Sequence, residues 1–201
     1  MALCFRCKMY LCCAGTHTAI DATLFAVESN HILPNDVEAI NEVVGPVFYN
    51  LLCDPLETKQ QPRTIVDAQF SIPFTVACAV VDRHVGLAHF SQQGLLRSDL
   101  AAMARKVTAR VDPNIRGIEG EACASVEIRL CDGAVHTARV ETAKGHPDNA
   151  VTLDDLTEKF YQCADVAAKP LRRDKLDEAV MRIRRMEDVD DVRSIVDLLV
   201  T

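Results

Sequence analysis

The sequence predicts an α+β fold: a small antiparallel sheet with helices packed on it, followed by a helical C-terminal tail. Two alternating segments joined by Asp132-Gly133 predict a β-hairpin over residues 123–141. Residues 74–81 are nearly all apolar and rich in small side chains, which favours a buried helix over an exposed strand. Beyond Asn149, apolar residues recur at steps of three and four, which is typical of amphipathic helices. These three observations together indicate the fold class.

The first elements follow from local patterns. Residues 17–29 carry apolar side chains at helical spacing and predict a helix. Residues 37–44 alternate enough to predict a strand. The residues expected on one face of this strand are Val37, Ala39 and Val43.

The middle of the chain contains a loop and a helix start. Residues 53–63 are polar and include two prolines, which predicts a loop. Thr64 is placed to cap the following helix, with Asp67 at the third position after it. Pro73 breaks that helix before the apolar segment begins, because proline interrupts helical hydrogen bonding. The apolar segment is expected to form the middle of the core.

The last quarter of the chain changes character. Thr152 starts a helix that is expected to run to about Ala164. Further apolar residues then form a stripe at helical spacing: Leu176, Ala179, Val180, Ile183, Met186, Val192, Ile195, Val196 and Leu199. Basic and acidic residues interleave around this stripe, which favours a solvated helix face over a basic patch. The stripe must be buried against something, and the chain supplies no obvious partner for all of it. We therefore expect two domains, an α+β domain over residues 1–150 and a helical tail over residues 151–201.

Composition excludes several classes of function. The chain has 201 residues and a formal net charge of −7, so no basic excess is available to neutralise nucleic-acid phosphates. No apolar run approaches the ~18 residues needed to cross a bilayer. Arg6 and Lys8 interrupt the N-terminal segment that could pass for a signal peptide. The nine cysteines are then expected to be reduced thiols, and the expected location is cytoplasmic, with neither nucleic acid nor membrane as a partner.

Chemically reactive side chains cluster near the N-terminus, just before the first helix: Lys8, Tyr10, Cys12, Cys13, Thr16 and His17. A cation, a phenol, thiols and an imidazole so close together indicate part of an active site. One alternative is a small zinc-binding module, because Cys4 and Cys7 have the spacing of half a zinc knuckle, with Cys12 and His17 as further ligands. Two adjacent cysteines such as Cys12 and Cys13 cannot both ligate one tetrahedral zinc ion without strain. The zinc site is therefore the weaker of the two interpretations.

Three segments carry a resemblance to a known family. Residues 8–22 (KMYLCCAGTHTAIDA) are similar to the Lys-x-Tyr-Pro-x-Cys stretch, with its following His and helix, of the MmgE/PrpD family. Residues 68–74 (AQFSIPF) resemble the family's Ala-Lys-Phe-Ser-Ile-Pro-Tyr motif. Residues 144–149 (KGHPDN) resemble its Lys-Gly-x-Pro-x-Asn stretch. Because the order and spacing of all three agree, the chain resembles the C-terminal portion of the family, without its N-terminal helical domain.

The resemblance implies a 2-methylcitrate dehydratase-like lyase that acts on a small di- or tricarboxylate without a cofactor or a metal. Proton abstraction beside a carboxylate and loss of water need an acid or base and a cation. The resemblance assigns these catalytic roles to Lys8 and His17, and substrate binding to Tyr10, Cys13 and Ser71. It also implies a homodimer, with the tail packed on a helical domain that a partner polypeptide supplies.

The chain departs from the family pattern at four positions. Leu11 stands in place of proline, Ala14 in place of an arginine found in many members, Gln69 in place of lysine and Phe74 in place of tyrosine. The three changes at Ala14, Gln69 and Phe74 remove polar groups, which indicates either a changed substrate or a catalytically inert member with a structural or dimerising role. Both alternatives are open at the level of sequence.

Overall fold

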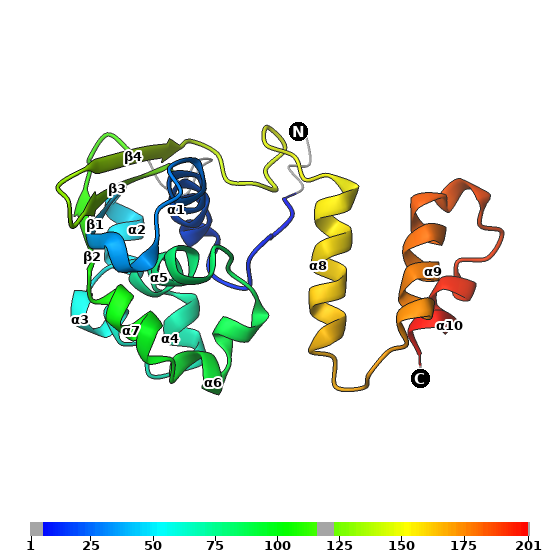
Figure 1. Cartoon of the computed structure of the whole chain (residues 1–201). Coiled ribbons are helices and arrows are strands. Elements are labelled where there is room, and N and C mark those ends of the chain that lie inside the picture. The colour runs from blue at the N-terminus through cyan, green and yellow to red at the C-terminus, as the bar shows by residue number, and fades with distance from the viewer. Residues whose placement is uncertain (1–5, 116–122, 201) are drawn as a thin grey trace. The chain divides into compact units, whose positions relative to one another are not determined.

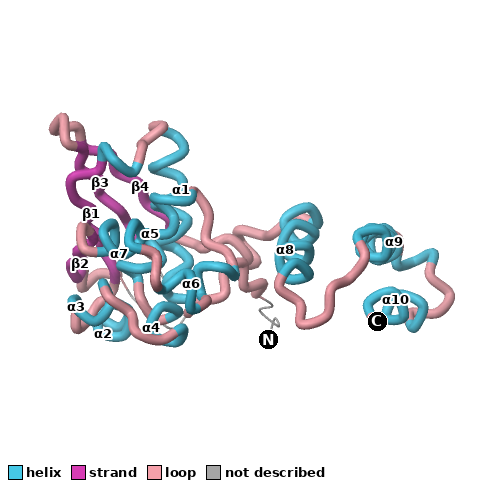
Figure 2. The backbone as a smooth tube through the Cα atoms, turned by 60° about the horizontal axis from the view of Figure 1, so that its bottom comes forward, coloured by secondary structure: helices cyan, strands magenta, loops and turns pink. Residues whose placement is uncertain are grey.

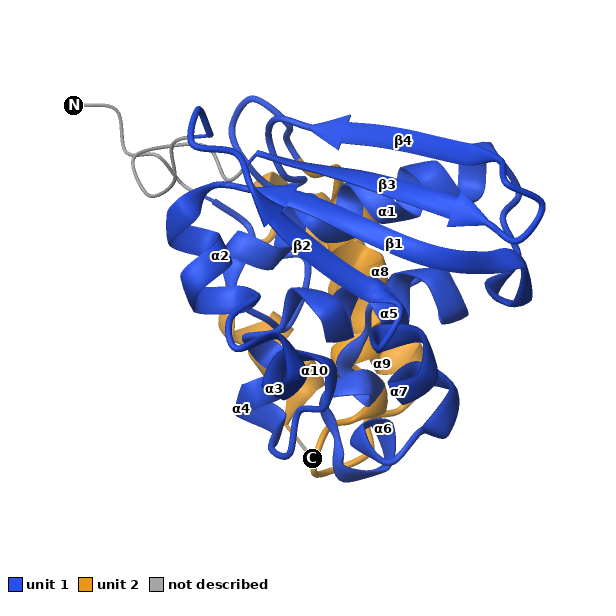
Figure 3. Cartoon of the chain, turned by 90° about the vertical axis from the view of Figure 1, so that its left-hand side faces the viewer, with its two compact units in different colours: residues 1–150 blue, residues 151–201 orange. Residues whose placement is uncertain are grey.

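The computed structural model describes residues 6–115 and 123–200 and divides the chain into two compact units. Unit 1 comprises residues 1–150 and unit 2 residues 151–201 (Figure 3). Unit 1 contains the sheet and the helices packed on it, and unit 2 contains helices alone among its described residues. The predicted α+β class is confirmed.

The sheet of unit 1 is mixed rather than antiparallel. Within the described residues it has four strands in the order β2-β1-β3-β4 (Figure 2). The strands are β1 (Val37–Val44), β2 (Val107–Val111), β3 (Ala124–Leu130) and β4 (Val135–Val140). The β1–β3 and β3–β4 pairs are antiparallel, as expected, but β2 pairs with β1 in parallel. The expectation of a purely antiparallel sheet was wrong. The short strand β2 has no local sequence pattern that identifies it as a strand, so its parallel pairing with β1 was not predicted.

Helices cover one face of this sheet (Figure 1). The α-helices that the structure describes in unit 1 are α1 (His17–Ser29), α2 (Pro46–Leu52), α3 (Leu56–Gln60), α4 (Ile65–Gln69), α5 (Ile72–Asp82), α6 (Gln92–Leu95) and α7 (Ser98–Ala104). Helix α1 contacts β3, β4 and α5, and α5 also contacts α7. The predicted helix over 17–29 is confirmed, and so is the buried helix formed by the apolar segment. Every residue from Ile72 to Val80 is buried.

The inner face of β1 differs from the predicted one. Val37, Ile40 and Val44 lie in the core under the helices. Ala39 is exposed, and Val43 packs in a separate small cluster with Ile115 and Cys123. The pairing of β1 with β3 shifts register between Val37 and Ala39. An irregularity of this kind interrupts the strict alternation of side chains, so the prediction from period two was wrong after Val37.

The segment predicted as a loop over residues 53–63 contains the short helix α3, so that prediction was wrong in part. The predicted cap at Thr64 is confirmed, because its side chain accepts a hydrogen bond from Asp67 N and Asp67 closes a capping box. Pro73 lies in the first turn of α5, where proline is tolerated. Ser71 caps that helix by accepting a hydrogen bond from Phe74 N at 3.0 Å.

The predicted hairpin is confirmed as β3 and β4. Gly133 in its turn has φ +88°, which glycine adopts without strain. Asp132 Oδ1 accepts a hydrogen bond from Ala134 N at 2.9 Å. The turn residues therefore do what Asp-Gly predicts.

Unit 2 consists of α8 (Leu153–Asp165), α9 (Arg173–Arg184) and α10 (Arg193–Leu199). Thr152 caps α8 in a capping box with Asp155, which confirms the predicted helix start. The interleaved charges pair with one another, as in Arg173–Asp177 and Arg182–Glu178. The apolar stripe is covered only in part: Leu176, Ala179 and Ile195 are buried. Its exposed large members include Ile183, Met186, Val192 and Val196.

None of the helices in the described part of the chain has the length and apolar character needed to cross a membrane.

Candidate functional site

The N-terminal segment lies against a turn that is more than 130 residues later in the sequence. Cys7 N donates a hydrogen bond to Gly145 O at 2.8 Å. Gly145 has φ +96°, and a Cβ atom there would lie 2.0 Å from the carbonyl oxygen of Cys7. Only glycine satisfies both conditions, so this position of the 144–149 motif is explained by close contact between two backbones.

The same motif closes its own turn. Gly145 N donates to Asn149 O at 2.8 Å and Asn149 N donates to His146 O at 2.9 Å. The Asn149 side chain donates to Thr142 O at 2.9 Å. The glycine and asparagine of the motif therefore shape the segment that carries Lys144 and His146.

A cavity of about 60 Å³ lies between these segments. Its described lining residues are Arg6, Cys7, Lys8, Ala14, His17, Thr18, Thr142, Ala143, Lys144, Gly145 and His146. Three of these side chains are cationic, two are imidazoles and none is a carboxylate. A lining of this kind favours an anion, because opposite charges attract most strongly where water is excluded.

Two of the predicted site residues, Lys8 and His17, line this cavity together. His17 is the first residue of α1 and is 3% exposed. The Tyr10 ring meets the His17 ring edge-on, with centroids 5.1 Å apart and an interplanar angle of 83°. This contact restricts the orientation of the imidazole.

Tyr10 itself does not line the cavity among the described residues. Its hydroxyl donates a hydrogen bond to Asp21 Oδ1 at 2.6 Å. Burial raises the pKa of Tyr10 above its usual range, and the nearby Asp21 charge acts in the same direction. The phenol is therefore a neutral donor to Asp21, and its predicted contact with substrate stays a prediction.

Cys13 and Ser71 lie outside the described lining of the cavity. Cys13 N donates to Gln69 O at 2.9 Å, and the Cys13 side chain packs against the core. Ser71 is fully buried, where its hydroxyl donates to Lys59 O at 2.5 Å in addition to capping α5. The structure thus gives Ser71 a structural role, and substrate binding by either residue stays a prediction.

The four departures from the family pattern have different surroundings. Ala14 lines the cavity, so alanine in place of the family's arginine leaves the site with one cation fewer. Gln69 Nε2 donates to Leu11 O at 3.1 Å and ties the N-terminal segment down. Phe74 is buried, with its ring centroid 6.3 Å from that of Phe90. Of these side chains, only Ala14 belongs to the cavity lining.

Reasoning from the sequence did not select Arg6, Lys144 or His146 as site residues. Lys144 and His146 belong to a motif that was recognised but given no chemical role. His146 Nδ1 lies 3.2 Å from Asp148 N and 3.4 Å from Asp148 Oδ2. Lys144 and His146 could have been recognised from the sequence, because their motif is basic and contains Gly145.

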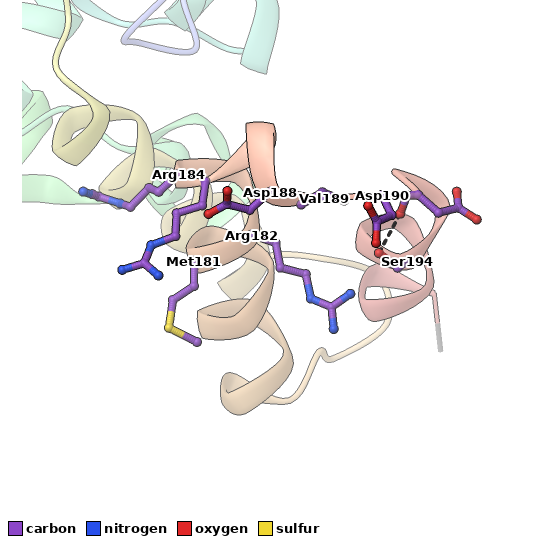
Figure 4. Close-up of a pocket in the computed structure, with 9 residues that line it drawn as sticks. Met181, Arg182, Arg184, Asp188, Val189, Asp190 and Ser194 are labelled. Carbon is purple, nitrogen blue, oxygen red and sulfur yellow. Dashed lines mark hydrogen bonds between the residues drawn. The ribbon is translucent and has the colours of Figure 1, made fainter.

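A second, larger groove of about 810 Å³ lies in unit 2, beside α9 and α10 (Figure 4). Its lining mixes arginine and aspartate side chains, with Met181 and Val189 among them. The arginines Arg182 and Arg184 pair with Glu178 and Asp154. Because aspartates line this groove together with arginines, it is less suited to an anionic ligand than a lining without carboxylates.

The zinc alternative depends on a residue outside the described range, since Cys4 is not among the described residues. Within residues 6–115 and 123–200, no group of three or more His, Cys, Asp or Glu side chains is arranged to hold a metal ion. Burial raises the pKa of Cys12 to about 11, and Thr16 Oγ1 lies 3.0 Å from its sulfur. The Cys12 thiol is therefore protonated near neutral pH in the absence of a metal.

Comparison with known proteins adds the family. The family profile of the MmgE/PrpD C-terminal domain matches residues 10–196. Cis-aconitate decarboxylase of Mus musculus is 24% identical over 138 residues, which cover 69% of this chain and 28% of that protein. Cis-aconitate decarboxylase of Homo sapiens is 25% identical over 134 residues, which cover 66% of this chain and 27% of that protein. The match thus spans little more than a quarter of the length of these relatives. The chain belongs to the MmgE/PrpD family, whose C-terminal domain it carries.

Proposed function

We propose that the cavity of unit 1 is one half of the active site of a lyase for small di- or tricarboxylates. The observation that carries the proposal is the convergence of two motifs, around Lys8 and around Lys144, on a cavity lined by cations and imidazoles. Anions with several carboxylates need several cations, because each buried carboxylate must be compensated.

In the proposed reaction, a base removes the proton from the carbon beside a substrate carboxylate. The electron pair of the broken carbon–hydrogen bond forms the new double bond. The carbon–oxygen bond of the neighbouring hydroxyl breaks, and that group leaves as water once it is protonated. Lys8 binds a carboxylate and stabilises the charge that develops on it during proton removal. His17 acts as the acid or the base, since an imidazole exchanges protons near neutral pH. Tyr10 contributes by orienting His17.

The size of the cavity supports a half-site. Pockets that enclose a whole small molecule measure roughly 300–1,000 Å³, and this cavity measures about 60 Å³. It can enclose one carboxylate end of a substrate, so other groups must contact the remainder. We propose that a helical domain supplies them, either on a longer form of this polypeptide or on a partner polypeptide, and that exposed apolar side chains of unit 2 pack on that domain.

Binding tests the anion site directly. Propane-1,2,3-tricarboxylate is a suitable probe, because it has no hydroxyl to lose, and its trimethyl ester is the neutral control. We expect the chain to bind the tricarboxylate and not the ester in a calorimetric titration. Lys8→Ala should weaken binding by about tenfold or more, the effect of losing one hydrogen bond to a charged group. Arg129→Ala, which removes the same charge from the exposed surface of β3, should leave binding unchanged.

Turnover tests the reaction. A helical domain of the family is added to the chain, and 2-methylcitrate and cis-aconitate are offered, the latter because both relatives carry the name cis-aconitate decarboxylase. We expect 2-methylcitrate to lose water only when both polypeptides are present, and His17→Asn to remove that activity. Loss of carbon dioxide from cis-aconitate instead would favour decarboxylation. Tricarboxylate binding without any turnover would favour the inert alternative.

A further inference from the structure

Asp21 lies one helical turn after His17 on α1. Residues four apart on a helix share a face, so α1 presents His17 to the cavity and Asp21 to the segments beside it. Asp21 is partly buried and is not among the described residues that line the cavity, and neither the family resemblance nor the proposed reaction gives it a role. Burying a carboxylate costs free energy unless hydrogen bonds compensate for the lost water.

Each oxygen of this carboxylate accepts a hydrogen bond from a segment beside the cavity. Oδ1 accepts the hydrogen bond from the Tyr10 hydroxyl at 2.6 Å, and Oδ2 accepts one from Lys144 N at 2.8 Å. Tyr10 belongs to the segment that carries Lys8, whereas Lys144 belongs to the turn on the other side of the cavity. One side chain of α1 thus joins two segments that are more than 130 residues apart in sequence.

We propose that Asp21 is a positioning residue that sets the spacing of the cavity walls. Through Tyr10 it orients the His17 ring, whose centroid is 5.1 Å from the Tyr10 centroid. Through Lys144 N it fixes the turn that presents the Lys144 and His146 side chains. This inference rests on the proposed function, because it assigns Asp21 to the carboxylate-binding site.

The environment of Asp21 agrees with such a role. Burial raises the pKa of Asp21, while the hydrogen bonds from Tyr10 and Lys144 lower it. The net effect is a raised pKa, and the same two contacts offset part of the cost of burying this carboxylate. Without Asp21, the Tyr10 hydroxyl and Lys144 N would each lose their acceptor, and the turn would lose its attachment to α1.

The test compares binding of propane-1,2,3-tricarboxylate by variants of the full chain. We expect Asp21→Ala to weaken binding by about tenfold, the effect expected when two partly buried donors lose an acceptor. Asp21→Asn should restore most of the affinity, because its oxygen can accept from Lys144 N while its amide donates to the Tyr10 oxygen. Tyr10→Phe, which removes one of the two contacts, should have a smaller effect than Asp21→Ala.

A double variant separates positioning from general destabilisation. If Asp21 acts through Lys144, the loss of affinity in Asp21→Ala combined with Lys144→Ala will be smaller than the product of the two single losses. Asp132→Ala is the matched control, since Asp132 also accepts a backbone hydrogen bond in a turn, at the opposite end of β4. It should lower the melting temperature without changing affinity.

Amide hydrogen exchange tests the hydrogen bond from Lys144 N to Asp21 without any ligand. Exchange at Lys144 N should accelerate in Asp21→Ala and remain slow in Asp132→Ala. Unchanged exchange and unchanged affinity in Asp21→Ala would overturn the inference, as would fully independent effects of Asp21 and Lys144. Failure of the unmodified chain to bind the tricarboxylate would instead overturn the proposed function, whatever the exchange result.

Discussion

Glu42 is a charged residue type in a fully buried position on β1. Its Oε1 lies 3.2 Å from Thr23 Oγ1, which also lies 2.8 Å from the Ala19 carbonyl oxygen. One hydroxyl hydrogen serves one of these acceptors at a time, so a proton on Glu42 lets both contacts be hydrogen bonds. Its Oε2 is buried without a hydrogen-bond partner among the described residues. Burial raises the pKa of Glu42 to about 8, and the protonated acid is the form that the core accommodates.

This residue predicts a pH dependence of stability. Between its ordinary pKa of 4.5 and the folded value of about 8, Glu42 is protonated in the folded chain and ionised in the unfolded one. The unfolded state then binds fewer protons, so this contribution to the free energy of unfolding falls by about 1.4 kcal/mol per pH unit as pH rises through that window. Glu42→Gln removes the titration while keeping the shape.

The measurement is urea unfolding of both chains at pH 5 and pH 8. We expect the stability of Glu42→Gln relative to the unmodified chain to be greater at pH 8 than at pH 5. Below pH 4.5 the difference should stop changing, because both states of Glu42 are then protonated. A difference that is independent of pH would show that Glu42 is ionised in the folded core.

At the scale of elements, caps and turns account for most of the local structure. Thr64, Ser71 and Thr152 each cap a helix, and two of them do so in a capping box with an aspartate. The turn at residues 142–149 is of another kind, because its own hydrogen bonds close it and it is also bonded to the N-terminal segment. The hydrogen bond from Cys7 N to Gly145 O makes the turn and that segment one structural element.

Two glycines in turns provide a matched pair for this element. Gly145 and Gly133 both have positive φ, so alanine at either position carries a backbone cost of roughly 1–2 kcal/mol. A Cβ at Gly133 meets nothing within 4 Å, whereas a Cβ at Gly145 would lie 2.0 Å from Cys7 O. We expect Gly145→Ala to lower the free energy of unfolding by more than Gly133→Ala, and to weaken tricarboxylate binding as well. Equal losses in denaturant unfolding, with binding intact, would contradict the role given to this turn.

At the scale of the whole molecule, the two units differ in how much core they contain. All three hydrophobic clusters of the described residues lie in unit 1, and the largest of them lies where α5 and the inner face of the sheet meet. Unit 2 buries three apolar side chains within its described residues: Leu176, Ala179 and Ile195. Its helices are amphipathic, yet four of the nine residues of the apolar stripe are exposed, and short helices with little burial are marginal in water.

This difference predicts independent behaviour of the two parts. A fragment of residues 1–150 should fold and melt in one cooperative transition, because burial within it is sufficient for a domain of that size. A fragment of residues 151–201 should show weak helicity and no cooperative transition. Circular dichroism over a temperature ramp measures both. A sharp transition in the short fragment alone, or none in the long one, would contradict this assignment of the core.

The order of the motifs was enough to predict the family, and local patterns were enough for most of the fold. The helix after His17, the buried helix after Ser71 and the hairpin at Asp132-Gly133 depend on periodicity, caps and turn residues. Such signals involve neighbours a few positions apart, and these can be found in one sequence. Lys8 and His17 were likewise found because they are close together in the chain.

The tertiary structure alone decided which segments meet. The parallel pairing of β2 with β1, the register irregularity of β1 and the position of Lys144 beside the N-terminal segment all depend on contacts between distant residues. No local pattern encodes them, because such contacts follow from packing the whole of unit 1 at once. Sequence by itself therefore determined the elements and the family, whereas packing decided that two basic motifs form one cavity and that Asp21 joins them.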